Sequence, residues 1–281
     1  MSDGHGGTLY VVATPIGNLA DITLRAIEVL GAVPRIAAED TRLTRRLLQR
    51  HGIDTPLVSY HARSGPGRLG ELLGYLRAGD DLALVTDAGT PAVSDPGADL
   101  VSAWAAEGGL VVPLPGASAV LAAVAAAGVA GPRWAFEGFL PRSGRDRRER
   151  LAAIAADGRG SVLFEAPGRV LGTLRDLAEA CGPERPAAVA RELTKLHEQI
   201  VRGTLAELVD SVADGTIPAR GEFVLVVGMG QPAVARGPET EALEAARSGV
   251  ERLVAEGVAR GEAARRVAAE TGIPRRRLYG R

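Results

Sequence analysis

Four short segments of the sequence combine residue types that suit a small-molecule site. Residues 14–19 contain a glycine turn, residues 39–42 place two carboxylates beside an arginine, and residues 113–118 contain a proline–glycine turn. Residues 86–97 carry two aspartates, two glycines and two prolines, which is denser than a simple connection needs. Each segment lies at the end of a short apolar run, and glycine lets the backbone approach a ligand closely. One such segment alone is most often structural, but the four together predict a binding site.

The sequence lacks the motifs of several familiar enzyme classes. No Gly-x-Gly-x-x-Gly follows the first apolar run, so ordinary dinucleotide-binding dehydrogenases lose support. The only lysine, Lys195, does not follow a glycine, which excludes a phosphate-binding loop. His197 and Glu198 are followed by Val201 where a helical zinc motif needs its second histidine, and a single Cys181 excludes an internal disulfide or a multi-thiolate zinc site. We therefore expect no metal site.

These segments need a scaffold, and short apolar runs alternate with helical patterns over the first 115 residues. The expected strands are 9–13, 36–38, 57–59, 82–85 and 110–114. Asp21 is expected to cap a first helix, and residues 66–78 repeat leucine at helical spacing. Strand, helix, strand at this spacing predicts a parallel sheet, and ligands bind at the carboxyl ends of such strands.

A second unit of the same style is expected between residues 134 and 229. Its strands are 134–136, 161–164, 187–190 and 223–227, and its helices are 145–156, 170–180 and 204–213. An alanine- and glycine-rich helix and turn at 119–131 mark the boundary, and the region after Gly230 differs in character. We predict an α/β fold with domains at 8–118 and 119–230, followed by a basic helical extension at 231–281.

Composition narrows the class of protein further. The 281 residues are 46% hydrophobic and 24% charged with a net charge of -1, which is typical of a folded globular chain. No apolar run approaches the roughly 18 residues of a membrane helix, and the polar start lacks a signal-peptide pattern. A cytoplasmic protein without a membrane partner is expected. Because arginine enrichment also follows from a GC-rich genome, the arginine count alone does not predict nucleic-acid binding.

Several segments resemble the tetrapyrrole-methylase superfamily. The matching segments are Thr-Pro-Ile-Gly-Asn-Leu-Ala-Asp-Ile at 14–22, Glu-Asp-Thr-Arg at 39–42, Asp-Ala-Gly-Thr-Pro-Ala-Val-Ser-Asp-Pro-Gly at 87–97, Pro-Gly-Ala-Ser-Ala at 115–119, and shorter ones at 137–141, 164–167, 191–195 and 221–224. Within the superfamily, the chain resembles the bacterial methyltransferases of a small-subunit ribosomal RNA ribose 2′-hydroxyl. Two segments depart from that branch, Gly168 where it commonly has histidine and Ala-Arg-Ser at 62–64, and both concern the expected RNA side.

The resemblance implies two α/β domains of the tetrapyrrole-methylase type with a small helical C-terminal extension. It implies S-adenosyl-L-methionine in the cleft between the domains, a homodimer, and methylation of a cytidine ribose in the small ribosomal subunit or its RNA. Carried over by position, the cofactor residues are Asp87, Ala88, Gly89, Pro91, Ser94, Asp95, Pro115, Gly116 and Ser118 from the first domain, with Arg191, Glu192 and Gly221 from the second.

A ribose hydroxyl reacts only when its proton leaves, which calls for a carboxylate or histidine as base. The candidates are Glu165, Asp40, Glu39 and His61, and the sequence does not choose among them. Glu165 has an equally simple alternative in an ion pair with Arg169 one helical turn later. His61 follows an apolar run and is as easily a hydrogen-bonding loop residue.

RNA binding needs positive charge in the right places. Two clusters offer it, and their alternative is a solvated helix face. The expected RNA-binding residues are Arg42, Arg45 and Arg46 in the first domain and Arg142, Arg145, Arg147 and Arg148 in the second.

The C-terminal extension predicts two amphipathic helices, at 242–254 and 263–268, in the manner of a small helix-turn-helix. Residues 260–281 hold seven arginines against two glutamates, so charge is segregated here. We expect the extension to become ordered on RNA, the alternative being a tail without a role.

Three functions remain open. An RNA ribose methyltransferase is favoured. The alternatives are a methylase of tetrapyrroles or other small molecules with the same fold, and a non-catalytic RNA-binding assembly factor.

Overall fold

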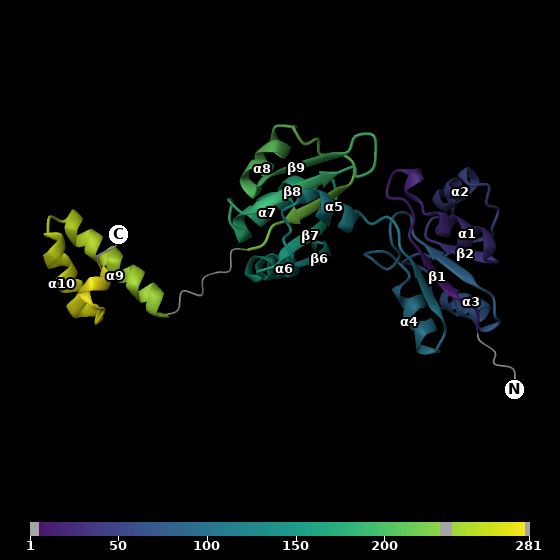
Figure 1. Cartoon of the computed structure of the whole chain (residues 1–281), viewed down its shortest axis with the longest axis horizontal. Helices are drawn as coiled ribbons and strands as arrows, with labels where there is room; N and C mark the ends of the chain where they lie inside the picture. Colours follow the sequence, from purple (N-terminus) through teal and green to yellow (C-terminus); the bar gives the residue numbers. More distant parts are fainter. Residues whose placement is uncertain (1–5, 231–237, 279–281) are drawn as a thin grey trace. The chain divides into compact units, whose positions relative to one another are not determined.

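The computed structural model describes residues 6–230 and 238–278 of the chain. The chain forms two compact units, Met1–Met229 and Gly230–Arg281 (Figure 1). Within the described residues, no helix is both long enough and apolar enough to cross a membrane. The first unit contains two five-stranded sheets, and the second unit is helical. The proposed division of the first unit into domains at residues 118 and 119 stays a prediction.

The first sheet is parallel throughout, as its strand–helix alternation predicts. Its strand order is β3-β2-β4-β1-β5, with β1 (Leu9–Val12) paired to both β4 (Leu82–Val85) and β5 (Val111–Leu114). The other strands are β2 (Arg35–Ala38) and β3 (Leu57–Ser59). The helices are α1 (Leu24–Ala32), α2 (Thr41–Arg50), α3 (Pro66–Arg77) and α4 (Ala98–Ala106). The carboxyl ends of β1, β2 and β4 therefore lie at one edge of the sheet.

Alternating side chains bury both faces of this sheet. Ala83 and Val85 pack with α1 and α2, whereas Leu82 and Leu84 pack with α3 and α4. All four residues of β4 are buried, which explains why the strand reads as a continuous apolar run.

The predicted cap of the first helix is wrong. The N-cap of α1 is Thr23, whose side chain accepts a hydrogen bond from the backbone N–H of Ala26. Asp21 instead ends a short 3-10 helix, η1 (Leu19–Asp21), which Asn18 caps. Thr23 is the cap because it lies directly before the first helical residue, where its hydroxyl reaches the free N–H groups of the first turn.

The second sheet differs from the first in strand direction. Its order is β6-β7-β10-β8-β9, and only β6 (Trp134–Phe139) and β7 (Gly160–Glu165) are parallel. The other pairs, formed with β8 (Pro186–Arg191), β9 (Gln199–Thr204) and β10 (Phe223–Val227), are antiparallel. The expectation of a second unit in the style of the first is therefore wrong. β9 was not predicted because its sequence, Gln-Ile-Val-Arg-Gly-Thr, contains no longer apolar run than two residues, and the strand is only partly buried at the edge of the sheet.

Helices cover both faces of the second sheet. α5 (Ala119–Ala127) packs on one face, and α6 (Gly144–Ala156), α7 (Val170–Cys181) and α8 (Leu205–Ala213) pack on the other. α5 follows β5 directly but packs against strands of the second sheet, so the chain changes sheets at about residue 118. Ile16, at the end of β1, also packs with this cluster and joins the two halves of the first unit.

The second unit consists of α9 (Pro238–Ala255), α10 (Arg260–Thr271) and α11 (Arg275–Leu278). Its small core contains Ala246, Val250, Ala263, Ala264, Val267 and Leu278. The two predicted helices are confirmed, and α11 is a third that was not predicted. Residues 231–237 and 279–281, which belong to the predicted extension, lie outside the described residues. Ordering of the extension on RNA stays a prediction.

Candidate functional site

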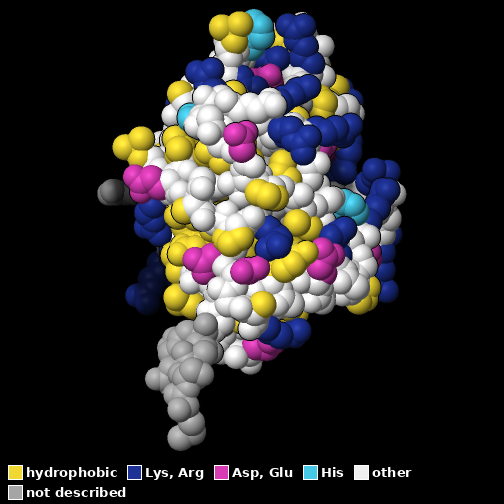
Figure 2. All heavy atoms as spheres, turned by 90° about the vertical axis from the view of Figure 1, so that its right-hand side faces the viewer, with side chains coloured by type: hydrophobic (Ala, Val, Ile, Leu, Met, Phe, Trp, Pro, Cys, Tyr) yellow, Lys and Arg dark blue, Asp and Glu magenta, His cyan; other side chains and the backbone are white. Residues whose placement is uncertain are grey.

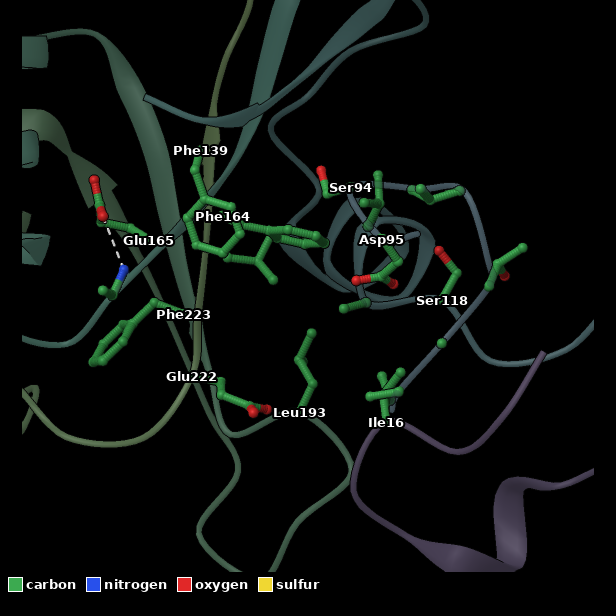
Figure 3. Close-up of a pocket in the computed structure, with 18 of the residues that line it drawn as sticks. Ile16, Ser94, Asp95, Ser118, Phe139, Phe164, Glu165, Leu193, Glu222 and Phe223 are labelled. Atoms are coloured by element: carbon green, nitrogen blue, oxygen red, sulfur yellow. Dashed lines mark hydrogen bonds between the residues drawn. The ribbon is translucent and has the colours of Figure 1, made fainter. Parts of the chain in front are cut away.

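A cavity of about 340 Å³, here called the first cavity, lies where the carboxyl ends of the first sheet meet the second sheet. Figure 3 shows Ser94, Asp95 and Ser118 on one wall and Phe139, Phe164 and Glu165 across from them. Its lining also includes Ile16, Ala88, Gly89, Thr90, Val93, Leu193, Gly221, Glu222 and Phe223. Residues separated by more than 200 positions thus form one small-molecule site.

Close backbone contacts fix the loops of the first sheet around this cavity. Thr14 and Gly89 exchange two backbone hydrogen bonds of 2.9 and 3.0 Å, which join the end of β1 to the loop after β4. Gly89 has a φ of +82°, a conformation that costs a side-chain-bearing residue energy. A Cβ on Gly116 would lie 2.8 Å from the Cβ of Ala13, so the loop after β5 can approach β1 only with glycine. Gly89 is therefore required by its backbone conformation and Gly116 by packing.

Four non-glycine residues among those described have positive φ, and all four lie in two loops that border the site. Ala92 and Ser94 have φ values of 67° and 65° in the loop after β4. Glu192 and Thr194 have values of 51° and 66° in the loop between β8 and β9. Such conformations cost of order 1–3 kcal/mol each and cluster at functional sites. Their shared location supports a functional role for both loops.

A group of carboxylates lies at the edge of the first sheet. Desolvation by burial, together with the neighbouring charges of Glu39 and Asp87, raises the pKa of Asp95 to about 6. Desolvation also raises the pKa of Glu39, whose carboxylate accepts a hydrogen bond of 3.3 Å from the backbone N–H of Asp87. Three carboxylates in one place create a negative potential, which would stabilise a bound cation.

A loop of the second sheet closes against the first sheet. Thr194 accepts a 3.1 Å hydrogen bond from the backbone N–H of Asn18, and a Cβ on Gly17 would lie 2.5 Å from the Cγ of Lys195. Lys195 Nζ donates to Glu192 at 2.7 Å and to Glu222 at 2.8 Å. We call Glu192, Lys195 and Glu222 the latch, because they fasten the β8–β9 loop to the segment directly before β10.

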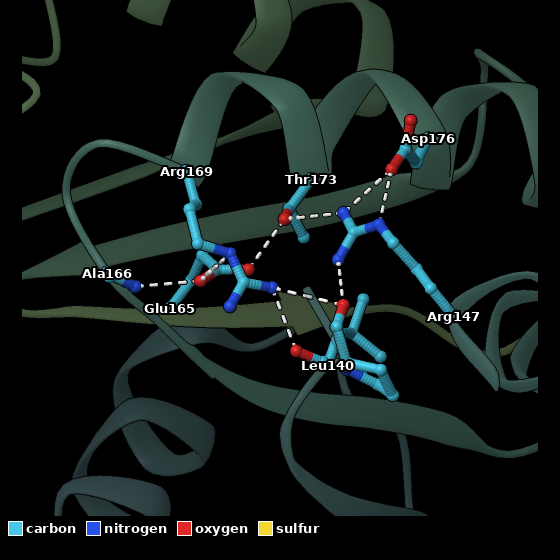
Figure 4. A network of polar contacts seen from close by, with 8 residues as sticks. Leu140, Arg147, Glu165, Ala166, Arg169, Thr173 and Asp176 are labelled. Atoms are coloured by element: carbon cyan, nitrogen blue, oxygen red, sulfur yellow. Dashed lines mark hydrogen bonds and ion pairs between the residues drawn. The ribbon is translucent and has the colours of Figure 1, made fainter. Parts of the chain in front are cut away.

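Glu165 belongs to a buried polar network (Figure 4). Its carboxylate accepts hydrogen bonds from Ala166 N–H at 2.8 Å and from the Thr173 hydroxyl at 2.6 Å, and it pairs with Arg169 at 3.2 Å. The side chain of Glu165 has no exposed surface. Figure 3 shows its carboxylate turned away from Asp95 and Ser118. The ion pair with Arg169, which the sequence offered as an alternative, is therefore present.

Arg147 departs from its expected place on an RNA-binding surface. Its side chain is only 11% exposed, and it pairs with Asp176 at 2.7 Å. It also donates to the Thr173 hydroxyl at 2.9 Å, so it belongs to the network of Glu165. The helical pattern showed an arginine-rich segment but not which arginine turns inward.

The predicted cofactor residues divide into two groups. Those that line the first cavity are Ala88, Gly89, Ser94, Asp95, Ser118 and Gly221. Those in the same loops but outside its lining are Asp87, Pro91, Pro115, Gly116, Arg191 and Glu192. Arg191 is buried and donates to the backbone carbonyls of Arg220 at 2.7 Å and His197 at 3.3 Å, so it supports the loops from behind.

Three of the four predicted bases, Asp40, Glu39 and His61, do not line the first cavity. Asp40 caps α2 and pairs with Arg42 at 2.7 Å, and this guanidinium holds the pKa of Asp40 well below its usual range. His61 is exposed, and its Nδ1 accepts a 3.2 Å hydrogen bond from Arg63 N–H. Phe139, Phe164 and Lys195 were not predicted as site residues. The signal for Lys195 was its status as the only lysine in the chain.

Most of the predicted RNA-binding arginines are exposed. Figure 2 looks onto the side of the first sheet and shows basic side chains gathered on its upper part, at the height of α2 in Figure 1. Arg42, Arg45 and Arg46 are exposed on α2, and Arg142, Arg145 and Arg148 are exposed at or before α6. Of these, Arg42 pairs with Asp40 and Arg145 with Glu149. In the described part of the chain the other four have no ion-pair partner.

The family model of the tetrapyrrole (corrin/porphyrin) methylases matches residues 8–209. The chain belongs to this family. Relatives called ribosomal RNA small subunit methyltransferase I match nearly its full length. The protein of Synechocystis sp. is 48% identical over 97% of this chain and 96% of its own, and that of Bacillus subtilis is 41% identical over 97% and 93%.

Solved structures agree with the fold. A cobalt precorrin-4 methyltransferase covers 79% of this chain and 94% of its own, with a TM-score of 0.59 and 21% identity. A uroporphyrin-III C-methyltransferase of Thermus thermophilus, complexed with S-adenosylhomocysteine, covers 79% and 97% with a TM-score of 0.57 and 21% identity. The predicted family and α/β fold are confirmed.

Proposed function

We propose that this protein is an S-adenosylmethionine-dependent methyltransferase of small-subunit ribosomal RNA, acting on the ribose 2′-hydroxyl of a cytidine. The observation that carries the proposal is the identity of 41 to 48% with near-full-length relatives called ribosomal RNA small subunit methyltransferase I. The likeness to porphyrin and corrin methyltransferases is much weaker, at 21%. A methylase of small molecules is therefore the less favoured function.

The residues of the first cavity fit S-adenosylmethionine. Backbone groups at Ala88 and Gly89 and the hydroxyls of Ser94 and Ser118 offer hydrogen bonds to its polar ends, and Phe139 and Phe164 offer apolar surface. Asp95, which lines the first cavity, suits the positive sulfonium. When bound, the cofactor supplies an electrophilic methyl group. The chain contributes positioning, because in-line displacement depends on how closely the reacting atoms are aligned.

Glu165 is the predicted base that lines the first cavity, but its oxygens already accept three polar contacts from the protein. We assign it a positioning role. Through Arg169, which donates to the Leu140 carbonyl at 2.8 Å, it fixes the turn after Phe139. That turn forms one side of the proposed cofactor site.

The substrate explains the distribution of exposed arginines. Arg45, Arg46, Arg142 and Arg148 offer unpaired guanidinium groups to RNA phosphates, which attract cations without regard to sequence. The second unit adds Arg260, which pairs with Glu251 of α9, and Arg265 and Arg266, which pair with Glu262 on their own helix. A homodimer and a cytoplasmic location stay predictions.

Labelled S-adenosylmethionine tests the function directly. The protein is incubated with immature small subunits, with naked small-subunit RNA and with a porphyrin precursor, and label is followed in each. We expect label in the RNA, at a 2′-hydroxyl identified by resistance of the adjoining bond to alkaline hydrolysis. Label in the porphyrin would favour the small-molecule methylase, and RNA binding without label would favour an assembly factor.

A further inference from the structure

A second cavity of about 290 Å³ adjoins the first. It lies between the ends of β1 and β4, the first half of α2, and the latch. Ile16, Ala88 and Glu222 line both cavities, so a molecule in one would lie beside a molecule in the other. Its volume is at the lower limit of small-molecule sites, about 300–1,000 Å³. This size suits one nucleotide better than a tetrapyrrole.

Apolar and polar side chains share the wall of the second cavity, and the apolar ones are Pro15, Ile16, Leu19, Leu43, Leu47 and Ala88. Pro15, Ile16 and Leu47 are buried at its base, whereas Leu19 and Leu43 are 39% and 43% exposed. Large exposed leucines at a cavity mouth offer surface for the flat faces of a base. An RNA base can enter such a pocket only after leaving its stack, which is how enzymes reach single nucleotides.

The polar side chains that line the second cavity differ in whether an atom is left without a hydrogen-bond partner. The hydroxyls of Thr14 and Thr44 already donate to backbone carbonyls, at 3.0 and 3.2 Å. Lys195 is held in the latch. Asp87 accepts a 2.8 Å hydrogen bond from Asp40 N–H through one carboxylate oxygen, and no described group donates to the other. Asp87 is thus the carboxylate of this cavity that a backbone hydrogen bond holds in place, whereas Glu222 is bound to Lys195.

A fixed carboxylate recognises a base that carries an amino group. Aspartate accepts a hydrogen bond from the cytosine N4 amino group, whereas uracil presents a carbonyl oxygen at that position and would be repelled. We propose that the second cavity receives the target base and that Asp87 selects cytosine through its amino group. This inference rests on the proposed function and moves Asp87 from the expected cofactor site to the substrate.

Arg46 supplies a complementary contact for the RNA chain. It lines the second cavity, is exposed, and has no ion-pair partner among the residues described. A phosphate next to the target nucleotide would meet its guanidinium, and such contacts position the RNA without reading its sequence. Arg50, on the same helix but outside the cavity lining, provides the matched control.

Binding of short RNAs tests the inference without requiring methyl transfer. The full chain, saturated with S-adenosylhomocysteine, is titrated with single-stranded UUCUU, UUUUU and a UUCUU containing N4,N4-dimethylcytidine. We expect the cytidine oligomer to bind about tenfold more tightly than the other two, because one amino–carboxylate hydrogen bond separates them. Equal binding of all three would overturn the proposal.

Asp87→Asn isolates the carboxylate, and Asp54→Asn, which changes an exposed aspartate elsewhere in the first unit, is the control. Asp87→Asn should abolish the preference for cytidine and leave the affinity for S-adenosylhomocysteine unchanged. Retained preference, or a loss of S-adenosylhomocysteine affinity, would overturn the assignment of Asp87. Arg46→Gln should weaken both natural oligomers alike, relative to Arg50→Gln, and an effect confined to one of them would contradict its phosphate role.

The two proposals fail in different ways. A protein that prefers cytidine oligomers but never labels RNA would contradict the proposed function and support this inference. A protein that labels ribosomal RNA but binds the oligomers equally would support the proposed function and contradict this inference.

Discussion

Glu165→Gln distinguishes a structural anchor from a proton acceptor. Glutamine keeps an oxygen for Ala166 N–H, but its amide group replaces the carboxylate oxygen that accepts from the Thr173 hydroxyl at 2.6 Å. It also removes the charge opposite Arg169, at 3.2 Å. The buried Thr173 hydroxyl then loses its acceptor, and the arginine loses its partner.

The size of the effect follows from these contacts. A hydrogen bond to a charged group contributes about 1.5–3 kcal/mol. Breaking a buried ion pair costs about 3–5 kcal/mol, but Arg169 is 28% exposed and water screens part of this loss. We expect the free energy of unfolding to fall by about 2–3 kcal/mol. In a unit of this size, a loss of 1 kcal/mol lowers the midpoint of thermal unfolding by about 2–4 °C. The midpoint should therefore fall by roughly 4–12 °C.

Thermal unfolding and single-turnover methylation at saturating RNA and cofactor are measured on the same preparations. A positioning role predicts a clear loss of stability and a modest loss of rate at temperatures where the variant stays folded. Thr173→Val serves as the control, because it removes the same hydrogen bond without touching the carboxylate. The double variant should lose less stability than the sum of the two. An unchanged midpoint with a rate reduced by about 10²-fold or more, as loss of a base predicts, would refute this reasoning.

Three further predictions concern other parts of the molecule. Burial raises the pKa of Asp95 from 3.8 to about 6, so the folded chain binds the Asp95 proton more tightly than the unfolded chain does. The stabilisation of the folded chain by this bound proton is complete below about pH 4 and is lost as the pH rises through 6. Asp95→Asn should therefore gain stability relative to wild type between about pH 4 and 7 in urea unfolding, and parallel pH profiles would contradict this. Gly221→Ala should weaken S-adenosylhomocysteine binding several-fold in calorimetry, because Gly221 has a φ of +88° and its Cβ would lie 2.5 Å from Glu192 Cδ; Gly215→Ala, at a φ of +85° with open space around it, should leave affinity intact. Deleting residues 231–281 should make RNA affinity less dependent on salt without changing cofactor affinity. Each lost phosphate contact should lower the slope of log affinity against log salt by about 0.7–0.9, and we expect the loss of several contacts. Equal slopes for the two proteins would exclude a role of the extension in RNA binding.

Much of the fold was predictable because local pattern and tertiary environment agree. β4 reads as an apolar run because both of its faces are buried, and the glycines at 89 and 116 stand where backbones approach each other. The direction of the strands in the second sheet was not predicted because β9 was not recognised as a strand; the short loop 192–198 joins β8 to β9, and the two pair antiparallel. The place of β10, between β7 and β8, depends on contacts between residues far apart in the chain, on which sequence spacing carries no information.

The candidate site, like the fold, was predictable in part from the sequence. Motifs identified the loops, and six of the predicted cofactor residues line the first cavity. Spacing could not tell that Arg147 turns inward to Asp176, because its neighbours on the helix have the same residue type. Nor could it tell that Asp87 and Asp95, eight positions apart, line different cavities. Both outcomes depend on where a side chain points once the sheets have packed.

The hydrogen bond between Asn18 and Thr194 spans 176 positions of the chain, and it has a consequence for synthesis on the ribosome. The first sheet can form as soon as β5 has emerged, but the wall made by Leu193, Gly221 and Phe223 is translated much later. A nascent or truncated chain therefore carries half of a ligand site. Because a ligand stabilises only the state that binds it, protection by the cofactor would begin after β10 is complete. Cofactor in the cell would thus favour the survival of finished molecules over fragments that have folded only their first half.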